Sequence, residues 1–372
     1  MIFGIDAREI QDGVSTGTGR VLDNFLRWFS ELDDEHRCIL FSEKKLQIEY
    51  GRRIIAVVAP AFPLTAVWDQ VLLPRLMRRH RIDFLFSPYY KVPITADIPV
   101  VSTIFDLMYL FYPMPWRGSG PFSRLYYRIF GTIMAAKARI IFTCSEYSKT
   151  EILRFYRVPE SNVAVIPLGL SDRYRVVEDR EASGKVMKKF GITGRYLLYT
   201  GNFKPHKNVA ILVDVVEKVR KMFPDITLVL AGNKDANYLP VGERIGRSSC
   251  ASSIVTTGRV TLDEQIILYN GATVFICPSL YEGFGYPPLE AMACGTPVVS
   301  SDRTSLAEII GDAALRCDPL NAVDISEKTC SLLQSADLSR QCRTRGLAQS
   351  RKFSNRLFCE RFYALLHSCG GT

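Results

Sequence analysis

The sequence has no apolar segment long enough to cross a bilayer, and it lacks the marks of a signal peptide. Its most apolar stretch, residues 54–67, is interrupted by Pro60 and Pro63 and is shorter than the roughly 20 residues that a membrane-spanning helix needs. The opening MIFGIDARE has no basic leader and no small-residue cleavage site, which indicates a first buried strand. These absences predict a protein that is soluble or bound at a membrane surface.

Spacings typical of metal sites and disulfide frameworks are also missing. The ten cysteines are scattered without a Cys-x-x-Cys pair, and no histidine accompanies them at zinc-site spacing. Several lie in apolar segments such as 274–279 and 291–296, where a thiol behaves as a small hydrophobic side chain. There is no Asp-x-Asp motif. We therefore expect reduced cysteines, a cytoplasmic protein, and neither a metal nor another cofactor.

Length and composition favour two globular domains. The 372 residues exceed the roughly 250–300 at which a single hydrophobic core stops growing. The sequence is 47% hydrophobic and 23% charged, which is ordinary for a globular chain without disordered tails. The net charge of +9 is shared by both halves, and no nucleic-acid-binding module is recognisable. A basic nucleic-acid-binding protein therefore remains only as the last alternative.

One segment has an unbalanced charge. Between Leu107 and Ser145 there is no acidic residue, while basic and aromatic side chains alternate. This composition suits an anionic membrane surface or a phosphate-bearing acceptor. The alternative is a partly buried helix whose arginines are simply solvated. The residues predicted for an acceptor or membrane surface are Tyr109, Trp116, Arg117, Arg124 and Arg128.

Short apolar runs alternate with helical patterns along the whole chain. The expected strands are residues 1–7, 54–58, 84–87, 100–104, 140–144 and 163–166, then 196–200, 227–231, 274–277 and 298–300. Near-continuous apolar strands between helices argue for parallel sheets that are covered on both faces. The polar stretch 171–184 separates two such series. The prediction is an α/β protein with two doubly wound domains, which bind ligands outside the carboxyl ends of their strands.

A glycine turn that leads into a helix lies in the segment PSLYEGFGYPPLEAMACGTPVV, residues 278–299. A buried strand is predicted to end at Cys277, and Gly283 and Gly285 then permit a tight turn. Pro287 and Pro288 suit the first turn of a helix, where their missing N–H groups do no harm. The backbone N–H groups of this turn are therefore expected to form an anion site at a helix N-terminus.

Two carboxylates flank that turn. Glu282 precedes it and Glu290 follows on the predicted helix, around the backbone of residues 284–286. Carboxylates beside a phosphate-binding turn are better explained by sugar hydroxyls than by phosphate. The alternative is that Glu290 merely stabilises its own helix N-terminus. We interpret the segment as a site for a nucleotide sugar.

The order of these and other motifs resembles the retaining glycosyltransferases of family 4. The segment from Glu282 to Glu290 resembles their E-x7-E motif. The other similar segments are STGTGR (15–20), CSEYSK (144–149), VAVIPLGL (163–170), TGNFKPHKN (200–208), TGRV (257–260) and SLAEIIGDAALRCDP (305–319). Each is weak alone, but their order over nearly the whole chain is specific. The resemblance implies the GT-B fold, with two facing Rossmann-like domains and a deep interdomain cleft.

The resemblance also implies domain roles and bounds. Residues 1–175 would form an acceptor-binding domain and residues 176–352 a nucleotide-sugar-binding domain. Residues 353–372 are predicted as a C-terminal helix that can pack on either domain, with the N-terminal domain as our choice.

Individual residues acquire roles by the same resemblance. Glu290 would bind the ribose hydroxyls, Glu282 the donor sugar near its anomeric centre, and Lys207 the diphosphate as the leaving group gains charge. The predicted catalytic residues are Glu282, Lys207 and Asp106. The predicted donor-binding residues are Gly17, Gly19, Asn202, Lys207, Val260, Glu282, Gly283, Phe284, Gly285, Tyr286 and Glu290.

The sequence departs from the family pattern at two positions. Asn202 stands where many members have an arginine, and Lys204 or His206 would have to supply the missing charge. Phe105 stands where many members have a histidine before Asp106, so an imidazole base is not available there. Asp106 would orient the acceptor or the donor sugar, or merely cap the following turn.

These features together predict a retaining glycosyltransferase that resembles bacterial mannosyltransferases of surface-polysaccharide synthesis. We expect the leaving phosphate oxygen to take the acceptor proton, with GDP-mannose as the first choice of donor and a UDP-sugar as the next. The expected acceptor is a lipid-linked saccharide of polysaccharide or lipopolysaccharide synthesis, reached from the inner face of the cytoplasmic membrane. The alternative within this fold is a nucleotide-sugar epimerase or a phosphorylase.

Overall fold

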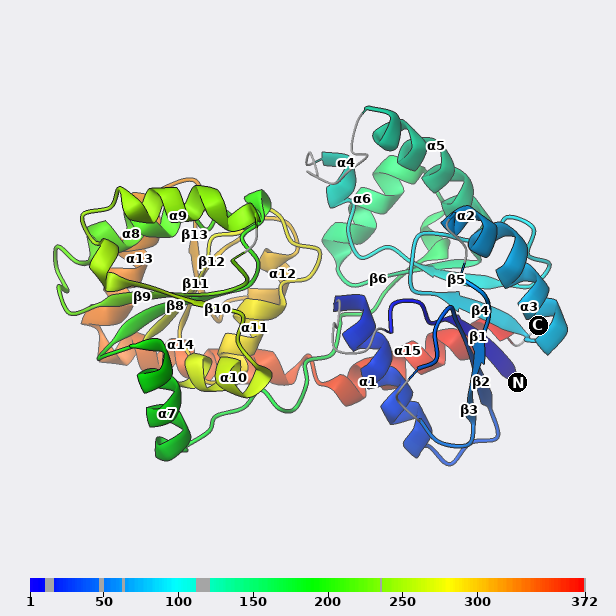
Figure 1. Cartoon of the computed structure of the whole chain (residues 1–372), viewed down its shortest axis with the longest axis horizontal. Helices are drawn as coiled ribbons and strands as arrows, with labels where there is room; N and C mark the ends of the chain where they lie inside the picture. The colour runs from blue at the N-terminus through cyan, green and yellow to red at the C-terminus, as the bar shows by residue number, and fades with distance from the viewer. Residues whose placement is uncertain (11–16, 47–49, 62–63, 112–120, 235, 371–372) are drawn as a thin grey trace. The chain divides into compact units, whose positions relative to one another are not determined.

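The chain forms two compact units, residues 1–169 with 355–372 and residues 170–354. The computed structural model describes residues 1–10, 17–46, 50–61, 64–111, 121–234 and 236–370, and Figure 1 shows both units as parallel sheets between helices. The chain therefore leaves the first unit after Gly169 and returns to it at Asn355.

The first unit is built on a seven-stranded parallel sheet with the order β3-β2-β1-β4-β5-β6-β7. Its strands are β1 (Ile2–Asp6), β2 (Arg37–Ser42), β3 (Ile54–Val58), β4 (Phe84–Ser87), β5 (Val100–Thr103), β6 (Ile140–Thr143) and β7 (Val163–Val165). All side chains of β4 and β5 are buried, as expected for a sheet that is covered on both faces. The order runs outward in opposite directions from β1 and β4, so these two neighbours mark a topological switch point.

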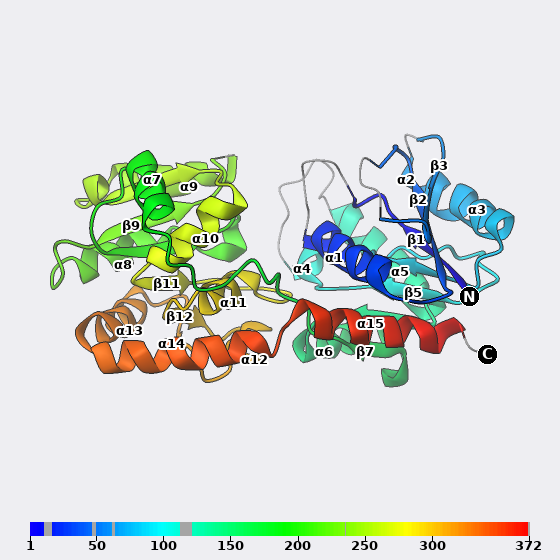
Figure 2. The same ribbon diagram turned by 90° about the horizontal axis from the view of Figure 1, so that it is seen from below.

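Helices cover both faces of this sheet. They are α1 (Gly17–Glu31), α2 (Thr65–Val67), α3 (Leu73–His80), α4 (Met108–Phe111), α5 (Pro121–Lys137), α6 (Glu146–Tyr156) and α15 (Asn355–Gly370). α1 and α15 pack against each other on one face, and α3, α5 and α6 lie over the other (Figures 1 and 2).

α15 covers the part of the first sheet that α1 leaves open. The ring of Phe362 lies 4.9 Å from those of Phe25 on α1 and Phe86 on β4, and 5.0 Å from that of Phe142 on β6. The helices in the connections between β4 and β7 lie only on the face opposite to α1. The C-terminal helix therefore supplies the apolar cover that this face needs, and each fully buried phenylalanine contributes about 1.5–3 kcal/mol.

The second unit has a six-stranded parallel sheet with the order β10-β9-β8-β11-β12-β13. Its strands are β8 (Tyr196–Thr200), β9 (Thr227–Ala231), β10 (Ile254–Gly258), β11 (Val274–Cys277), β12 (Val298–Ser301) and β13 (Leu315–Cys317). β8 and β11 are neighbours and every one of their side chains is buried. The switch point of this sheet therefore lies between β8 and β11.

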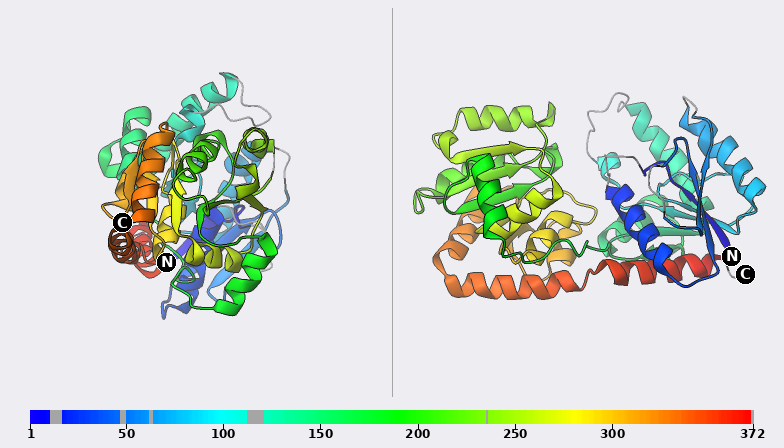
Figure 3. Two further views of the ribbon diagram at one scale, coloured as in Figure 1. Left: turned by 90° about the vertical axis from the view of Figure 1, so that its left-hand side faces the viewer. Right: turned by 60° about the horizontal axis from the view of Figure 1, so that its bottom comes forward.

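The helices of the second unit form two layers about its sheet (Figures 1 and 3). They are α7 (Arg180–Phe190), α8 (Ile211–Val219), α9 (Leu239–Gly246), α10 (Leu262–Gly271), α11 (Tyr286–Ala293), α12 (Leu306–Ile310), α13 (Ala322–Gln334) and α14 (Ala336–Arg351). α8 packs against α13, whereas α11 packs against α14 and α10 against α7.

The ten strands predicted from apolar runs are present, and the sheets contain three more, β2, β10 and β13. β13 lies in the segment 305–319, for which only the family resemblance implied a strand. β2 begins at Arg37, directly after the mostly charged residues 31–36, and its apolar run is short. β10 lies at the sheet edge, pairs with β9 alone, and has only half-buried side chains. Within the described residues, no helix is both long and apolar enough to cross a membrane. None of the ten cysteines forms a disulfide, and nine of them are buried.

Candidate active site

The loops that follow β8 and β11 meet at the switch point of the second unit. Because both strands end at the same edge of the sheet, their carboxyl-end loops are neighbours. The backbone N–H of Leu280 in the second loop donates to the carbonyl of His206 in the first, at 2.7 Å. The two segments singled out from the sequence, 200–208 and 278–299, are thus brought together by topology.

Gly201 and Gly232 allow the loop after β8 to lie close to the loop after β9. Gly201 has a φ of +138° and donates its N–H to Ala231 O at 2.9 Å. A Cβ atom on Gly232 would lie only 2.0 Å from the carbonyl oxygen of Gly201. Any larger residue at 232 would displace the backbone that leads to Lys207. Gly232 was not among the residues predicted from the sequence.

Lys207 and Glu282 form a close ion pair across the two loops. Nζ of Lys207 lies 2.6 Å from Oε1 and 2.7 Å from Oε2 of Glu282. The two side chains are 15% and 11% exposed, so the pair is only partly screened by water. Ser279 donates its hydroxyl to Oε1 of Glu282 at 2.8 Å. A cation and a carboxylate are therefore held together beside the crevice of the sheet, and their roles towards a donor stay a prediction.

The backbone of Glu282 is held by the turn before α12. Its N–H donates to Oγ1 of Thr304 at 3.0 Å, and its carbonyl accepts from the hydroxyl of Ser305 at 2.8 Å. The same Ser305 hydroxyl also reaches Phe284 O at 3.0 Å. Ser279, Thr304 and Ser305 were not predicted as part of the site, because scattered hydroxyl residues have no distinctive sequence pattern.

The predicted glycine turn leads directly into α11. Gly285 has a φ of +109° and is the residue before the helix, whose first turn contains Pro287 and Pro288. A Cβ on Gly285 would lie 2.6 Å from Cδ2 of Leu306, so both conformation and space require glycine. The side chain of Phe284 is buried against Tyr286. Contacts of the backbone in this turn with a sugar or phosphate stay a prediction.

Glu290 lies on α11 and is 2% exposed. Its Oε2 accepts from the Tyr269 hydroxyl at 2.8 Å and from Nε2 of Gln265 at 3.3 Å. Burial, together with the adjacent Glu290 charge, raises the pKa of Tyr269 well above its usual value, so the phenol keeps its proton and remains a donor. The two donors on α10 fix the position of the carboxylate, and its predicted role towards the ribose stays a prediction.

Gln265 and Tyr269 were not predicted as site residues, although their spacing of four residues places them on one face of α10. The predicted donor residue Val260 lies just before Thr261, which caps this helix. Val260 is half-buried.

The side chain of Asn202 turns back into its own loop. Its Oδ1 accepts from the Lys204 N–H at 3.3 Å, and its carbonyl accepts from the Tyr199 hydroxyl at 2.7 Å. His206 is buried, and burial followed by the Lys207 charge lowers its pKa to about 4. It is therefore neutral at pH 7, so it does not supply the charge that Asn202 lacks.

The sequence-predicted residues of the first unit lie at the carboxyl edge of its own sheet. Oδ1 of Asp106 accepts from the Met108 N–H at 3.0 Å, which is the capping arrangement considered as the alternative to a catalytic role. The preceding carbonyl of Phe105 accepts from Ser148 at 2.7 Å. Gly17 begins α1 and is exposed, while Gly19 is buried within it. Residues 15 and 16 of the predicted glycine loop lie outside the described residues.

An ionic cluster at the switch point of the first unit was not predicted. Arg8, which follows β1, lies 2.6 Å from Oδ2 of Asp6 and 2.5 Å from Oδ1 of Asp69. Its guanidinium also lies over the rings of Trp68 and Tyr89, at 5.1 and 5.5 Å from their centroids. Burial raises the pKa of Asp6, although Arg8 opposes this effect. The cluster fixes a cation beside the crevice of this unit.

The predicted acceptor or membrane surface is described only in part. The hydroxyl of Tyr109 is 2.6 Å from that of Tyr156, so this residue contributes to packing between α4 and α6. Arg128 on α5 is exposed, and so are the neighbouring Ile129, Phe130 and Ile133. Trp116 and Arg117 lie outside the described residues, as does the side chain of Arg124.

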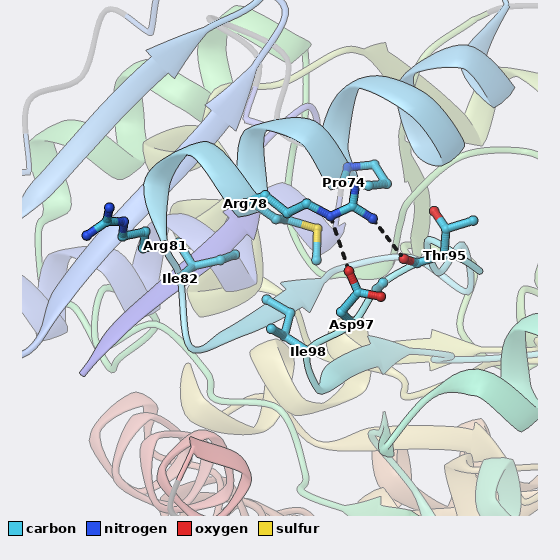
Figure 4. Close-up of a pocket in the computed structure, with 9 residues that line it drawn as sticks. Pro74, Arg78, Arg81, Ile82, Thr95, Asp97 and Ile98 are labelled. Atoms are coloured by element: carbon cyan, nitrogen blue, oxygen red, sulfur yellow. Dashed lines mark hydrogen bonds and ion pairs between the residues drawn. The ribbon is translucent and has the colours of Figure 1, made fainter.

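A small pocket in the first unit is separate from all of these residues (Figure 4). It has a volume of about 150 Å³ and lies between α3 and residues 95–98, with Arg78 and Asp97 paired at its rim at 3.1 Å. Ligand pockets for molecules of drug size typically have about 300–1,000 Å³. The pocket is at the amino ends of β4 and β5 and is too small for a nucleotide sugar.

Two family models match successive parts of the chain. Residues 15–173 match the model described as Glycosyltransferase Family 4, and residues 184–349 match the model for glycosyl transferases group 1. Together the two models cover most of both units, with their boundary close to the point where the chain enters the second unit.

Individual relatives agree with these models. The O-antigen chain mannosyltransferase B of Escherichia coli is 34% identical over 58% of this chain and 57% of its own. The serotype-specific mannosyltransferase WbdA of the same organism is 29% identical over 72% of this chain and 34% of its own. The chain thus spans between a third and just over half of the length of these relatives.

Solved structures show the fold. The structure of Alr3699/HepE from Anabaena, in complex with UDP and glucose, has a TM-score of 0.78 at 16% identity and covers 99% of both chains. The predicted GT-B architecture of two Rossmann-like domains is confirmed by this match and by the two parallel sheets. The predicted cleft between the domains stays a prediction.

Proposed function

Because the chain belongs to glycosyltransferase family 4, we propose that it is a retaining transferase that moves a hexose from a nucleotide sugar to a lipid-linked saccharide. The product would serve polysaccharide or lipopolysaccharide synthesis. The names of the curated relatives, which are mannosyltransferases of O-antigen chains, support this class of acceptor.

The observation that carries the proposal is the pairing of Lys207 with Glu282 at the switch point of the second unit. Parallel sheets bind nucleotides at such a point, and Glu290 lies one helix turn beyond the predicted anion site. Lys207 would stabilise the charge that develops on the departing diphosphate, and Glu282 would contact the donor sugar. Glu290 would accept from the ribose hydroxyls. The site thus offers one group for each part of a nucleotide sugar.

In the proposed reaction, the bond from the anomeric carbon to the diphosphate oxygen breaks, and the acceptor oxygen bonds to the same face of the sugar. The leaving phosphate oxygen takes the acceptor proton, so no enzymic base is needed. This agrees with Phe105, which cannot act as a base. Lys207 and the N-terminus of α11 supply the positive charge that favours departure.

GDP-mannose is the first choice of donor, and the relatives named as mannosyltransferases support it. A UDP-sugar is the next choice, supported by the Anabaena neighbour that was solved with UDP and glucose. Melting temperatures measured with equal concentrations of GDP, UDP, ADP and their sugars would rank these donors, because a tighter ligand stabilises the folded chain more.

The function is tested by transfer from the best donor to lipid-linked saccharide, with wild type and Glu282→Gln. We expect Glu282→Gln to lower turnover by about 10²-fold or more while donor affinity changes little. Glu308→Gln serves as a control for a carboxylate in the same unit. Unchanged turnover would reject the assignment of Glu282. Isomerised donor in the absence of acceptor would instead indicate an epimerase.

We also propose that the protein is cytoplasmic and peripheral on the inner face of the membrane. On α5 the exposed apolar side chains of Ile129, Phe130 and Ile133 stand beside the exposed Arg128, a combination that suits anionic lipid surfaces. In flotation at low salt, we expect anionic vesicles to retain the wild type and Ile129→Ser/Ile133→Ser to bind less. Equal recovery with neutral and anionic vesicles would contradict this proposal.

A further inference from the structure

Two of the four histidines meet in the first unit although they lie at opposite ends of the sequence. His36 is in the turn between α1 and β2, and His367 is near the end of α15. Together with Asp34 they form a group in which one ligand atom of each residue lies within 4.8 Å of the others. All three side chains are half-buried.

The donor atoms of this group face one another. Nδ1 of His36 is 2.5 Å from Oδ1 of Asp34, and the two imidazole rings have centroids 4.3 Å apart. Within the described residues, Nδ1 of His36 is buried and has no partner in hydrogen-bond geometry. Its contact with Asp34 is therefore a short ion-pair distance without a well-aligned hydrogen bond.

Neighbouring groups hold the three side chains in place. Tyr363 donates its hydroxyl to Oδ2 of Asp34, and its ring packs edge-on against that of His367 with 4.6 Å between centroids. Arg53 donates to the carbonyl of Asp34 at 2.9 Å. Metal ligands are typically oriented by a second layer of hydrogen bonds of this kind.

We propose that Asp34, His36 and His367 bind one divalent transition-metal ion, with Zn²⁺ as the expected ion. Two imidazoles and one carboxylate suit Zn²⁺, whereas Mg²⁺ and Ca²⁺ prefer sites made of oxygen ligands. Three protein ligands leave one position of a tetrahedral site for water. The proposal does not rest on the transferase activity.

The location assigns this ion a structural role. β2 begins at Arg37, directly after His36, so the site is at the amino ends of the parallel strands. The loops of the crevice follow the opposite, carboxyl ends. An ion at this position would join the last turns of α15 to the turn before β2, and would thereby hold the C-terminal helix on the first sheet.

The test is Zn²⁺ binding to the full chain after removal of metals with a chelator. All samples carry Cys250→Ser, because Cys250 is the one cysteine that is not buried. We compare this protein with His36→Gln/His367→Gln, and with His80→Gln, which removes a histidine of the same unit outside the group. Calorimetry gives stoichiometry and affinity, and thermal unfolding gives the shift of Tm.

We expect one equivalent of Zn²⁺ to bind to the parent and to His80→Gln, and the double variant to bind at least about tenfold more weakly. At 100 times Kd, the metal should raise Tm by about 5 °C or more in the parent and leave that of the double variant unchanged. Co²⁺ should give the visible spectrum of a tetrahedral site only with the first two proteins. Equal Zn²⁺ binding by all three proteins, or none by the parent, would overturn the proposal.

Discussion

Replacement of Lys207 by methionine is expected to lower kcat for hexose transfer by about 10²–10³-fold, or roughly 3–4 kcal/mol of transition-state stabilisation. Methionine keeps much of the length of the side chain but removes the charge that lies 2.6 Å from Oε1 of Glu282. The charge on the diphosphate grows as the sugar departs, so the loss should fall on kcat more than on donor affinity. Steady-state kinetics with the best donor measure both parameters.

A control for this variant tests whether the loss of activity arises only because Glu282 is left without its cation. Removal of Lys207 leaves the carboxylate of Glu282, which is 11% exposed, without its cation, and this is expected to destabilise the unit by about 1–3 kcal/mol. The double variant Lys207→Met/Glu282→Gln should recover much of that stability and none of the activity. Lys221→Met, at an exposed position, should behave as wild type. Recovery of activity in the double variant would show that Lys207 serves only to neutralise Glu282.

Glu290→Gln is expected to raise KM for the nucleotide sugar by about tenfold or more, which corresponds to at least ~1.4 kcal/mol of binding. The ribose is remote from the bond that breaks, so its contacts are the same in the ground state and the transition state. Such uniform binding changes KM and leaves kcat nearly unchanged. Calorimetric titration with the nucleoside diphosphate, without acceptor, checks the same loss directly.

Tyr269→Phe tests whether donor affinity depends on the position of the Glu290 carboxylate as well as on its charge. It removes the hydroxyl that donates to Oε2 at 2.8 Å and keeps the carboxylate, so a smaller loss of donor affinity is expected. Glu243→Gln, on the exposed side of α9, is the matched control. A large fall in kcat at constant KM for Glu290→Gln would place this residue in the chemical step and reject the ribose assignment.

Strands were predictable where their residues form a continuous apolar run. β8, β9 and β11 begin and end at the residues expected from the sequence. β10 was missed because three of its five positions, 256–258, are polar or glycine and shorten its apolar run. The sequence signal of a strand is thus its continuous apolar run: β3, an edge strand with no buried residue, was predicted at 54–58, whereas the largely buried β2 was missed.

The candidate site was predictable to the extent that backbone conformation restricts residue type. Gly285 is required by a φ of +109° and by the proximity of Leu306, so the turn has a recognisable pattern. Ser279, Thr304 and Ser305 hold Glu282 through single hydroxyl bonds. Many sequences would permit such bonds, and only the packed structure shows which hydroxyls make them.

The sequence alone determined the class of fold and the glycine turn from Glu282 to Glu290. Apolar strands that alternate with amphipathic helices, and glycine at a positive φ, both leave local patterns in the sequence. The tertiary structure alone decided which distant residues meet. It placed Lys207 against Glu282, Tyr269 against Glu290, and His36 against His367. These contacts depend on the order of strands in each sheet and on the return of α15 to the first unit. Neither leaves a fixed spacing along the chain, and that is the physical reason why sequence spacing could not reveal them.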